Sequence, residues 1–249
     1  MTLALASMLV SALLVGLLIG CVGIGGVLLP PALVYVGGLE FHLAAATSAW
    51  AFLFCGVAGT LSYSKRRSLD WRMAAWLGAG VVPTAVAGAW ANVALPEGVL
   101  MGLLAALMVV TGAEALLRRP VVEQEEARCR FGAPTLLAVG AFVGFGSALT
   151  GTGGGVLLLP ILLLLRTPVL AAVGAGMVVS LPIAVFATAG YVLYGSVDFG
   201  LGTALGLVAV VGVVVGARIA HLAKAATQRR VVAWALLSTG LLIAAQTVW

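Results

Sequence analysis

The chain has 249 residues, of which 63% are hydrophobic and only 8% are charged, and its mean hydropathy is +1.20. A soluble domain of this length needs a charged surface, so the composition excludes a soluble globular protein and indicates a membrane protein. The formal net charge of +5 comes from basic residues spread over several loops without interleaved aromatic residues, which excludes a nucleic-acid-binding footprint.

Long apolar stretches broken by glycine predict an all-α polytopic membrane protein with ten hydrophobic segments. In chain order we expect them at Thr2–Gly20, Gly25–Val36, Leu43–Ser64, Met73–Ala91, Val99–Leu117, Pro134–Leu149, Gly154–Leu165, Val169–Tyr194, Gly200–His221 and Val231–Val248. At about 1.5 Å per residue, the second and seventh reach only about 18 Å, short of a ~30 Å hydrocarbon core. These two are expected to be half-helices or steeply packed short spans.

The basic residues predict how the segments are oriented. Every Lys and Arg lies in or beside an odd-numbered connection between segments, within Lys65–Arg72, Arg118–Arg130, Arg166 and Arg218–Arg230. Odd-numbered connections share one face of a bilayer, so this is the positive-inside pattern. It predicts a multi-pass protein of the cell inner membrane with cytoplasmic basic loops and with both termini outside.

The two halves of the chain repeat each other at an offset of about 129 residues. Gly25–Leu29 matches Gly154–Leu158, and Ser68–Trp71 matches Ser196–Phe199. Five segments per half require the second half to be inverted. Accordingly, a loop that carries Lys and Arg in one half has no basic residue at the matching position in the other. We predict an N-terminal repeat at 1–117, a cytoplasmic linker at 118–131 and an inverted C-terminal repeat at 132–249. Inverted repeats are typical of secondary transporters, with the substrate site at the repeat interface.

Glycine-rich breaks precede the two short segments at matching positions, and they are expected to meet near the midplane. Non-helical backbone at membrane depth is tolerated only when it is buried in protein or lines a wet cavity. The amides that begin the following helix then point inward as an anion site without a cationic side chain. The alternative is that these glycines allow tight helix packing or mark a bend. We predict as substrate-binding glycines Gly23, Gly25, Gly26, Gly151, Gly153, Gly154 and Gly155.

Small hydroxyl side chains near the breaks are candidate donors to a bound oxyanion. We assign this role to Thr47, Ser48 and Thr152, and less strongly to Ser180; the alternative is a hydrogen bond to their own or a neighbouring helix. Trp50 lies one helical turn from Thr47 and is a candidate cavity wall, with packing or interfacial anchoring as the alternative.

Asp70 and Asp198 each begin a predicted segment two residues after a serine, which favours helix N-caps, with a proton-coupling role as the alternative. Segments 1 and 2, and likewise 6 and 7, either both cross the membrane or form a re-entrant pair. The positions of the basic loops do not decide between these, because both arrangements place those loops on the same side. No His, Cys or carboxylate cluster has metal or catalytic spacing, so we expect no cofactor, no metal and no enzymatic activity.

Two blocks carry a resemblance to a known family. Gly23–Leu33, GIGGVLLPPAL, and Gly151–Leu162, GTGGGVLLLPIL, are similar to the duplicated motif of the TauE/SafE sulfite exporter family, also called the toluene-sulfonate uptake permease family. Ala46-Thr47-Ser48 and Gly216-Ala217-Arg218 resemble two further elements of that family. The second half has Ala175-Gly176 where the first has Thr47-Ser48, so the halves are not expected to bind a ligand identically.

The resemblance implies transport of small sulfur oxyanions or organosulfonates, such as sulfite, thiosulfate or sulfoacetate. We expect a secondary transporter that works by alternating access in the lipid bilayer, with a proton as the simplest coupling ion. An anion channel with an amide-lined pore is the alternative. The choice of anion, the direction of transport, the coupling ion and the oligomeric state do not follow from the sequence.

Overall fold

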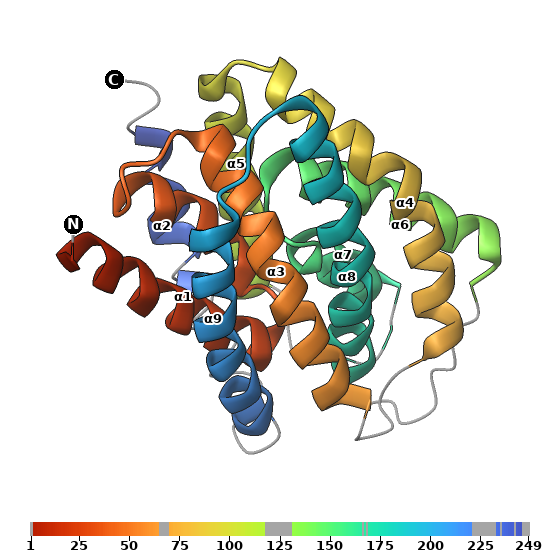
Figure 1. Ribbon diagram of the computed structural model, residues 1–249. Coiled ribbons are helices and arrows are strands. Elements are labelled where there is room, and N and C mark those ends of the chain that lie inside the picture. The colour runs from red at the N-terminus through yellow and green to blue at the C-terminus, as the bar shows by residue number, and fades with distance from the viewer. Residues whose placement is uncertain are drawn as a thin grey trace.

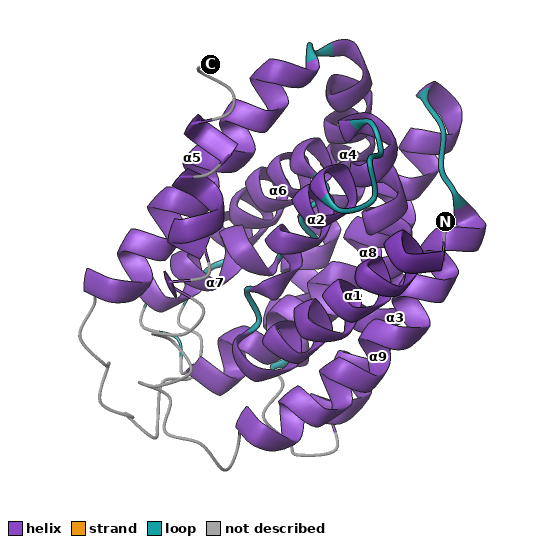
Figure 2. Ribbon diagram, turned by 90° about the vertical axis from the view of Figure 1, so that its left-hand side faces the viewer, coloured by secondary structure: helices purple, strands orange, loops and turns teal. Residues whose placement is uncertain are grey.

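The computed structural model describes residues 2–64, 70–117, 131–165, 167, 169–220, 233, 234, 236–241 and 243–245, and within these ranges every regular element is a helix (Figures 1 and 2). The predicted all-α class is confirmed. The elements are α1 (Thr2–Val22), the 3₁₀ helix η1 (Gly25–Leu28), α2 (Leu29–Tyr35), α3 (Phe41–Ser64), α4 (Trp71–Ala94), α5 (Glu97–Leu117), α6 (Ala133–Thr150), α7 (Gly155–Leu164), α8 (Val169–Tyr194) and α9 (Phe199–Ala220).

Seven of the described helices are long and apolar enough to cross a membrane: α1, α3, α4, α5, α6, α8 and α9. The stretch Gly25–Tyr35, which joins η1 to α2, is a shorter apolar helix, as expected for the second segment. The tenth predicted segment is helical at its described residues, 233, 234, 236–241 and 243–245. The predicted cytoplasmic linker (all but Phe131), Arg166 and most of the predicted basic loops lie outside the described residues.

Helix packing follows the sequence repeat. Helix α1 packs on α9 and α6 packs on α4, while α3 packs on both α8 and α9 and α8 packs on α4. Figure 1 shows α3 between α9 and α8. Exchanging each helix for its counterpart, α1 for α6, α3 for α8 and α4 for α9, reproduces the same set of contacts. The two halves therefore have a pseudo-two-fold arrangement, with the α3–α8 contact at its centre.

Glycines bring the α1–α9 and α4–α6 pairs into backbone contact. A Cβ atom at Gly16 would overlap the carbonyl of Ala209, and one at Gly140 would overlap the carbonyl of Leu77. Small residues allow membrane helices to approach in this way, because packing and not hydrophobicity holds helices together in lipid. Glycines within the long helices therefore allow close helix packing, which is the alternative that we considered for the glycines of the breaks.

Two tyrosines repeat one interhelical hydrogen bond in both halves. The Tyr63 hydroxyl of α3 donates to the carbonyl of Gly20 in α1 over 3.0 Å, and the Tyr191 hydroxyl of α8 donates to the carbonyl of Ala148 in α6. In both pairs the partners are 43 residues apart, and both tyrosine side chains are buried. The pseudo-symmetry thus extends from helix packing to single side chains.

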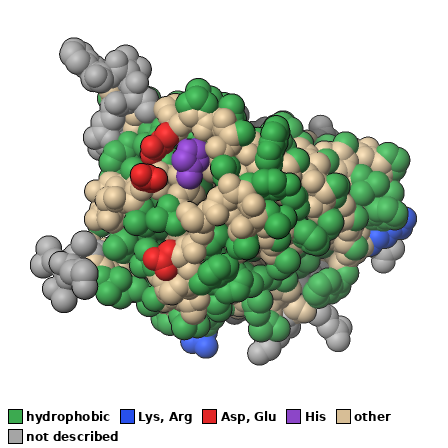
Figure 3. Space-filling view, turned by 45° about the horizontal axis from the view of Figure 1, so that its top comes forward, with side chains coloured by type: hydrophobic (Ala, Val, Ile, Leu, Met, Phe, Trp, Pro, Cys, Tyr) green, Lys and Arg blue, Asp and Glu red, His purple; other side chains and the backbone are tan. Residues whose placement is uncertain are grey.

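The described arginines and a group of acidic side chains lie at opposite ends of the molecule. Helices α3 and α9 run in the same direction, because Gly202 faces Thr47 and Gly206 faces Ala51. Arg72, just after the end of α3, and Arg218, in the last turn of α9, therefore lie toward the same end. At the other end Figure 3 shows acidic side chains and a histidine gathered on the surface. The residues that begin or precede helices at that end are Glu40, His42, Glu97 and Asp198.

Aspartates set the start of two helices, as predicted. Asp70 is the N-cap of α4 and accepts a hydrogen bond from the amide of Met73 over 3.1 Å. Asp198 precedes α9 and accepts from the amide of Leu201 over 2.9 Å. Each carboxylate thereby satisfies an amide that has no partner inside the helix.

Candidate functional site

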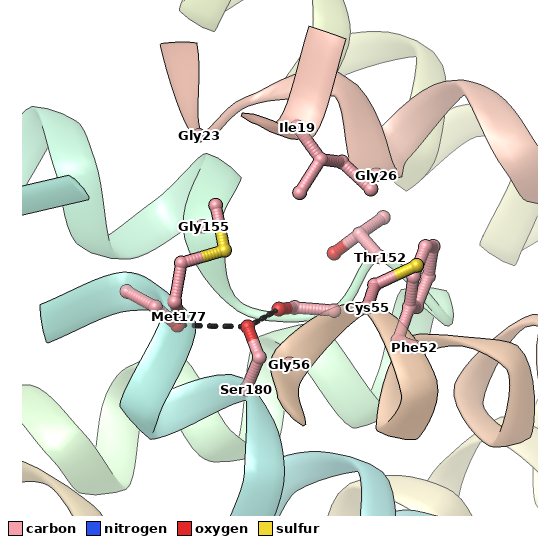
Figure 4. Close-up of a pocket in the computed structure, with 12 residues that line it drawn as sticks. Ile19, Gly23, Gly26, Phe52, Cys55, Gly56, Thr152, Gly155, Met177 and Ser180 are labelled. Carbon is pink, nitrogen blue, oxygen red and sulfur yellow. Dashed lines mark hydrogen bonds between the residues drawn. The ribbon is translucent and has the colours of Figure 1, made fainter. Parts of the chain in front are cut away.

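A small cavity lies beside the middle of α3 and α8, where the two halves meet (Figure 4). Each half contributes six of the residues that line it. They are Ile19, Gly23, Gly26, Phe52, Cys55 and Gly56 from the first half, and Thr152, Gly153, Gly155, Gly176, Met177 and Ser180 from the second. The cavity is therefore shared between the halves and belongs to neither alone.

The two glycine breaks contact each other at this cavity. A Cβ atom at Gly26 would lie 2.6 Å from the carbonyl oxygen of Thr152, and one at Gly155 would overlap the carbonyl oxygen of Gly23. The two contacts are counterparts under the sequence repeat. Glycine is needed at both positions because the backbone of the opposite break occupies the space that a side chain would take.

At each break the chain reverses and returns along the helix it has just left. Gly25 faces Val15, Leu18 and Ile19 of α1, and Gly37 comes back to Met8 near the start of α1. In the second half Gly146 of α6 faces Leu157 of α7. Each break is thus the tip of a hairpin that reaches the molecular centre.

The second break leaves the first amides of α7 outside the helical bonding pattern, next to the cavity that Gly155 lines. Helix α6 ends at Thr150, and Gly153 and Gly154 adopt left-handed backbone conformations with φ of +74° and +87°. The first backbone bond that enters α7 runs from the Leu158 amide to the Gly154 carbonyl over 3.1 Å. The amides just before Leu158 therefore precede the helical bonding pattern and stay available to a ligand.

The first break is built differently. Only Gly23 has a left-handed conformation there, with φ of +80°. The chain continues through the short η1 into α2, whose first turn contains Pro30 and Pro31. The backbone conformation of the two breaks therefore differs, although the amides that begin η1, like those that begin α7, precede the helical bonding pattern.

Hydroxyl groups around the second break are already hydrogen-bonded. Thr150 donates to the Gly146 carbonyl over 2.8 Å, and its oxygen lies 3.0 Å from that of Thr152. Since Thr150 has one hydroxyl proton, Thr152 is the donor in the second bond. The Ser180 hydroxyl lies 2.5 Å from the carbonyl of Gly153 and 2.8 Å from that of Gly176, and it ties α8 to the break (Figure 4).

The structure brings six of the predicted substrate-binding residues to the cavity: Gly23, Gly26, Thr152, Gly153, Gly155 and Ser180. Three other predicted glycines face packed helices instead. Gly25 faces α1, Gly151 faces Ala45 of α3, and Gly154 faces Ile183 of α8.

Two predicted residues of α3 point toward α9. Thr47 is buried and accepts a hydrogen bond from the Asp198 amide over 3.3 Å. Trp50 donates to the Thr203 hydroxyl over 2.9 Å and meets Phe199 edge-on.

Ser48 is fully buried, and its hydroxyl has no hydrogen-bond partner in the described structure. Its counterpart in the second half, Gly176, lines the cavity. Ser48 is therefore a buried donor with unused capacity on the helix that forms one wall of the site.

The remaining lining residues were not selected as site residues from the sequence. Ile19, Phe52 and Met177 are apolar residues within apolar helices, and nothing distinguishes them from lipid-facing or core positions. Gly176 had one signal, since it aligns with Ser48 under the repeat. Phe52 is nonetheless central, because its ring lies against both Gly26 and Gly153.

The cavity is small in this conformation. Its volume is about 20 Å³, enough for one water molecule. An oxyanion needs more room, so the surrounding side chains or helices must move before one can bind. Among the residues that the structure describes, no group of three or more His, Cys, Asp or Glu side chains is placed to hold a metal ion.

Comparison with known proteins gives one match. The family model described as Sulfite exporter TauE/SafE matches residues 4–243, nearly the whole chain. No curated protein and no solved structure matches the chain.

Proposed function

The chain belongs to the sulfite exporter TauE/SafE family of membrane transporters for sulfur compounds, and from this premise we propose that it carries small sulfur oxyanions or organosulfonates by alternating access. The substrate site is the cavity where the two glycine breaks meet, and the chain acts as a transporter without catalysing a reaction.

One observation carries this proposal: the glycine breaks of both halves contact each other at a cavity that both halves line equally. Inverted-repeat transporters bind their substrate at the interface between the repeats. The amides at the start of α7 supply the positive end of a helix dipole to the same space. We assign the anion to these amides, with Ser48 as an additional hydroxyl donor once the site opens.

Alternating access requires a closed state from which either side can open. Two features support such a state: the cavity is too small for an oxyanion, and the packing of α1 on α9 and of α6 on α4 is related by the pseudo-two-fold. Movement of one half against the other opens the cavity to one end of the molecule. The movement related to it by the pseudo-two-fold symmetry opens the cavity to the other end. An open anion channel would need a continuous wide path, which a cavity for one water molecule does not favour.

The orientation that we propose follows the charges. Arg72 and Arg218 at one end, together with the basic residues of the adjoining loops, face the cytoplasm of a cell bounded by an inner membrane. The acidic end, with Glu40 and Glu97, faces outward. Both termini then lie outside.

The test uses purified protein in detergent and a panel of sulfite, thiosulfate, sulfoacetate, taurine, phosphate and chloride. A ligand at 100 times its dissociation constant stabilises the folded state by about 2.7 kcal/mol, which raises the melting temperature measurably. We expect a selective shift with at least one of these sulfur compounds, and saturable counterflow of the same compound in proteoliposomes. Conductive flux without counterflow would support the channel, and no shift with any sulfur compound would contradict the proposed substrate class.

A further inference from the structure

The cavity lining offers an anion very little beyond backbone. None of the twelve lining residues has a charged or amide side chain. The larger side chains are apolar or sulfur-containing: Ile19, Phe52, Cys55 and Met177 (Figure 4). An anion that binds here therefore has part of its surface against hydrocarbon, thiol and thioether groups.

The two hydroxyl side chains in the lining have committed their protons. Thr152 donates to Thr150, and Ser180 shares its proton between the carbonyls of Gly153 and Gly176. The donors left in the lining are the backbone amides of the two breaks, where η1 and α7 begin. The breaks meet at one junction while Phe52, Cys55 and Met177 line the rest of the cavity, so these amides can satisfy one oxygen-bearing face and not a full tetrahedron of oxygens.

No countercharge for a dianion lines the cavity in the described structure. The Lys and Arg side chains within the described ranges are Arg72, in the first turn of α4, and Arg218, in the last turn of α9. His42 sits at the start of α3 and is hydrogen-bonded to Asn92. The cost of removing an ion from water grows with the square of its charge, so without a cation a dianion is far more costly to bury than a monoanion.

We infer that this cavity selects singly charged sulfur oxyanions that have an apolar or protonated pole, such as methanesulfonate or hydrogensulfite, and rejects the dianions sulfate and hydrogenphosphate. The inference rests on the proposed function, because it describes the same site. The oxygen face of the anion binds the α7 amides, and its other pole packs against Phe52, Cys55 and Met177.

The first test measures the dissociation constants of methanesulfonate, sulfite and sulfate by thermal stabilisation at mildly acidic and mildly alkaline pH. Sulfite loses its remaining proton near neutrality, whereas methanesulfonate is singly charged throughout. We expect sulfate to bind at least about tenfold more weakly than methanesulfonate. Sulfite affinity should fall as the pH rises, while methanesulfonate affinity stays level and corrects for any titration of the protein.

The second test adds donors to the apolar wall. Met177→Gln keeps the length of the side chain and supplies two amide protons, and it should improve sulfate affinity relative to methanesulfonate by about tenfold. Cys55→Ser, a smaller change, should act in the same direction. Cys21→Ser is the matched control, because that thiol donates to the Gly216 carbonyl and does not line the cavity. Melting without ligand confirms that each variant is folded.

The outcomes separate the inference from the function on which it rests. Binding of sulfate as tightly as methanesulfonate overturns the inference and leaves sulfur-compound transport intact. The inference is also overturned if sulfite affinity rises with pH, or if both folded cavity variants keep the original affinity ratio. Failure of every sulfur compound to bind overturns the proposed function and the inference together.

Discussion

Gly155 in the second break lies directly against the carbonyl oxygen of Gly23 in the first, with no space between them for a side chain. The counterpart contact, Gly26 against the Thr152 carbonyl, closes the other side of the same junction. The two hairpin tips thus form one packed unit at the centre of the molecule, and the cavity lies beside it.

Gly155→Ala tests how tightly this junction is packed. The added methyl group overlaps backbone atoms, which cannot rotate away as a flexible side chain could. We expect a loss of about 1–3 kcal/mol of stability, the usual cost of overpacking, seen as a lower melting temperature in detergent. An unchanged melting temperature would mean that the two breaks are not held in contact.

Gly176→Ala separates ligand binding from stability. Its Cβ would lie 3.9 Å from the Gly155 Cα, an ordinary contact, and would project into the cavity lining. Replacing a helical glycine should keep or raise stability, by up to about 1 kcal/mol, while the methyl group narrows a cavity that holds one water molecule. We therefore expect affinity for sulfur oxyanions to fall by about tenfold or more without loss of folding.

The control for this variant is Gly102→Ala in α5. No atom lies within 4 Å of its Cβ position, so the substitution adds the same methyl group to a helix away from the cavity. It should match wild type in affinity. Equal affinities for wild type and the Gly176 variant would place the ligand elsewhere.

The fold was largely predictable because two independent signals agree. The apolar stretches and the Lys and Arg residues between them predict the segments and their alternation, and the repeat pairs each helix with a counterpart. Both depend on residue types that are rare or distinctive in an apolar chain, such as Arg218 or the glycine runs. The sequence also predicted that the two breaks meet, but it left open whether each short segment crosses or re-enters. That choice depends on how the helices pack, as does the contact of Gly155 with the Gly23 carbonyl.

The site was predictable only at the glycine breaks. Helical periodicity divides α3 into a face with Thr47, Trp50 and Phe54, which meets α9, and a face with Phe52 and Cys55, which meets the cavity. Proximity in sequence to the break indicated Thr47 and Trp50 as site residues. The apolar side chains on the other face give no sequence signal, since Phe and Cys in a membrane helix are as consistent with core packing.

The symmetric tyrosine bonds give a paired prediction. Tyr63→Phe and Tyr191→Phe each leave a buried helix carbonyl, of Gly20 or Ala148, without its donor. The loss should be about 1–3 kcal/mol in each case and similar for the two variants, because the pseudo-symmetry makes the two environments equivalent. Tyr194→Phe, at a half-exposed side chain, should melt like wild type. If Tyr63→Phe and Tyr191→Phe also melt like wild type, these two hydrogen bonds make no net contribution to stability.

The last prediction distinguishes a structural from a coupling role for Asp70 and Asp198. Both carboxylates cap helices, so Asp→Ala at either position should cost about 0.5–2 kcal/mol. Asn caps a helix about as well as Asp but carries no charge and binds no proton near neutrality. We therefore expect Asp70→Asn and Asp198→Asn to keep both the melting temperature and proton-gradient-driven uptake in proteoliposomes. A variant that melts normally, retains counterflow and loses only the response to the pH gradient would instead identify its aspartate as the proton-coupling residue.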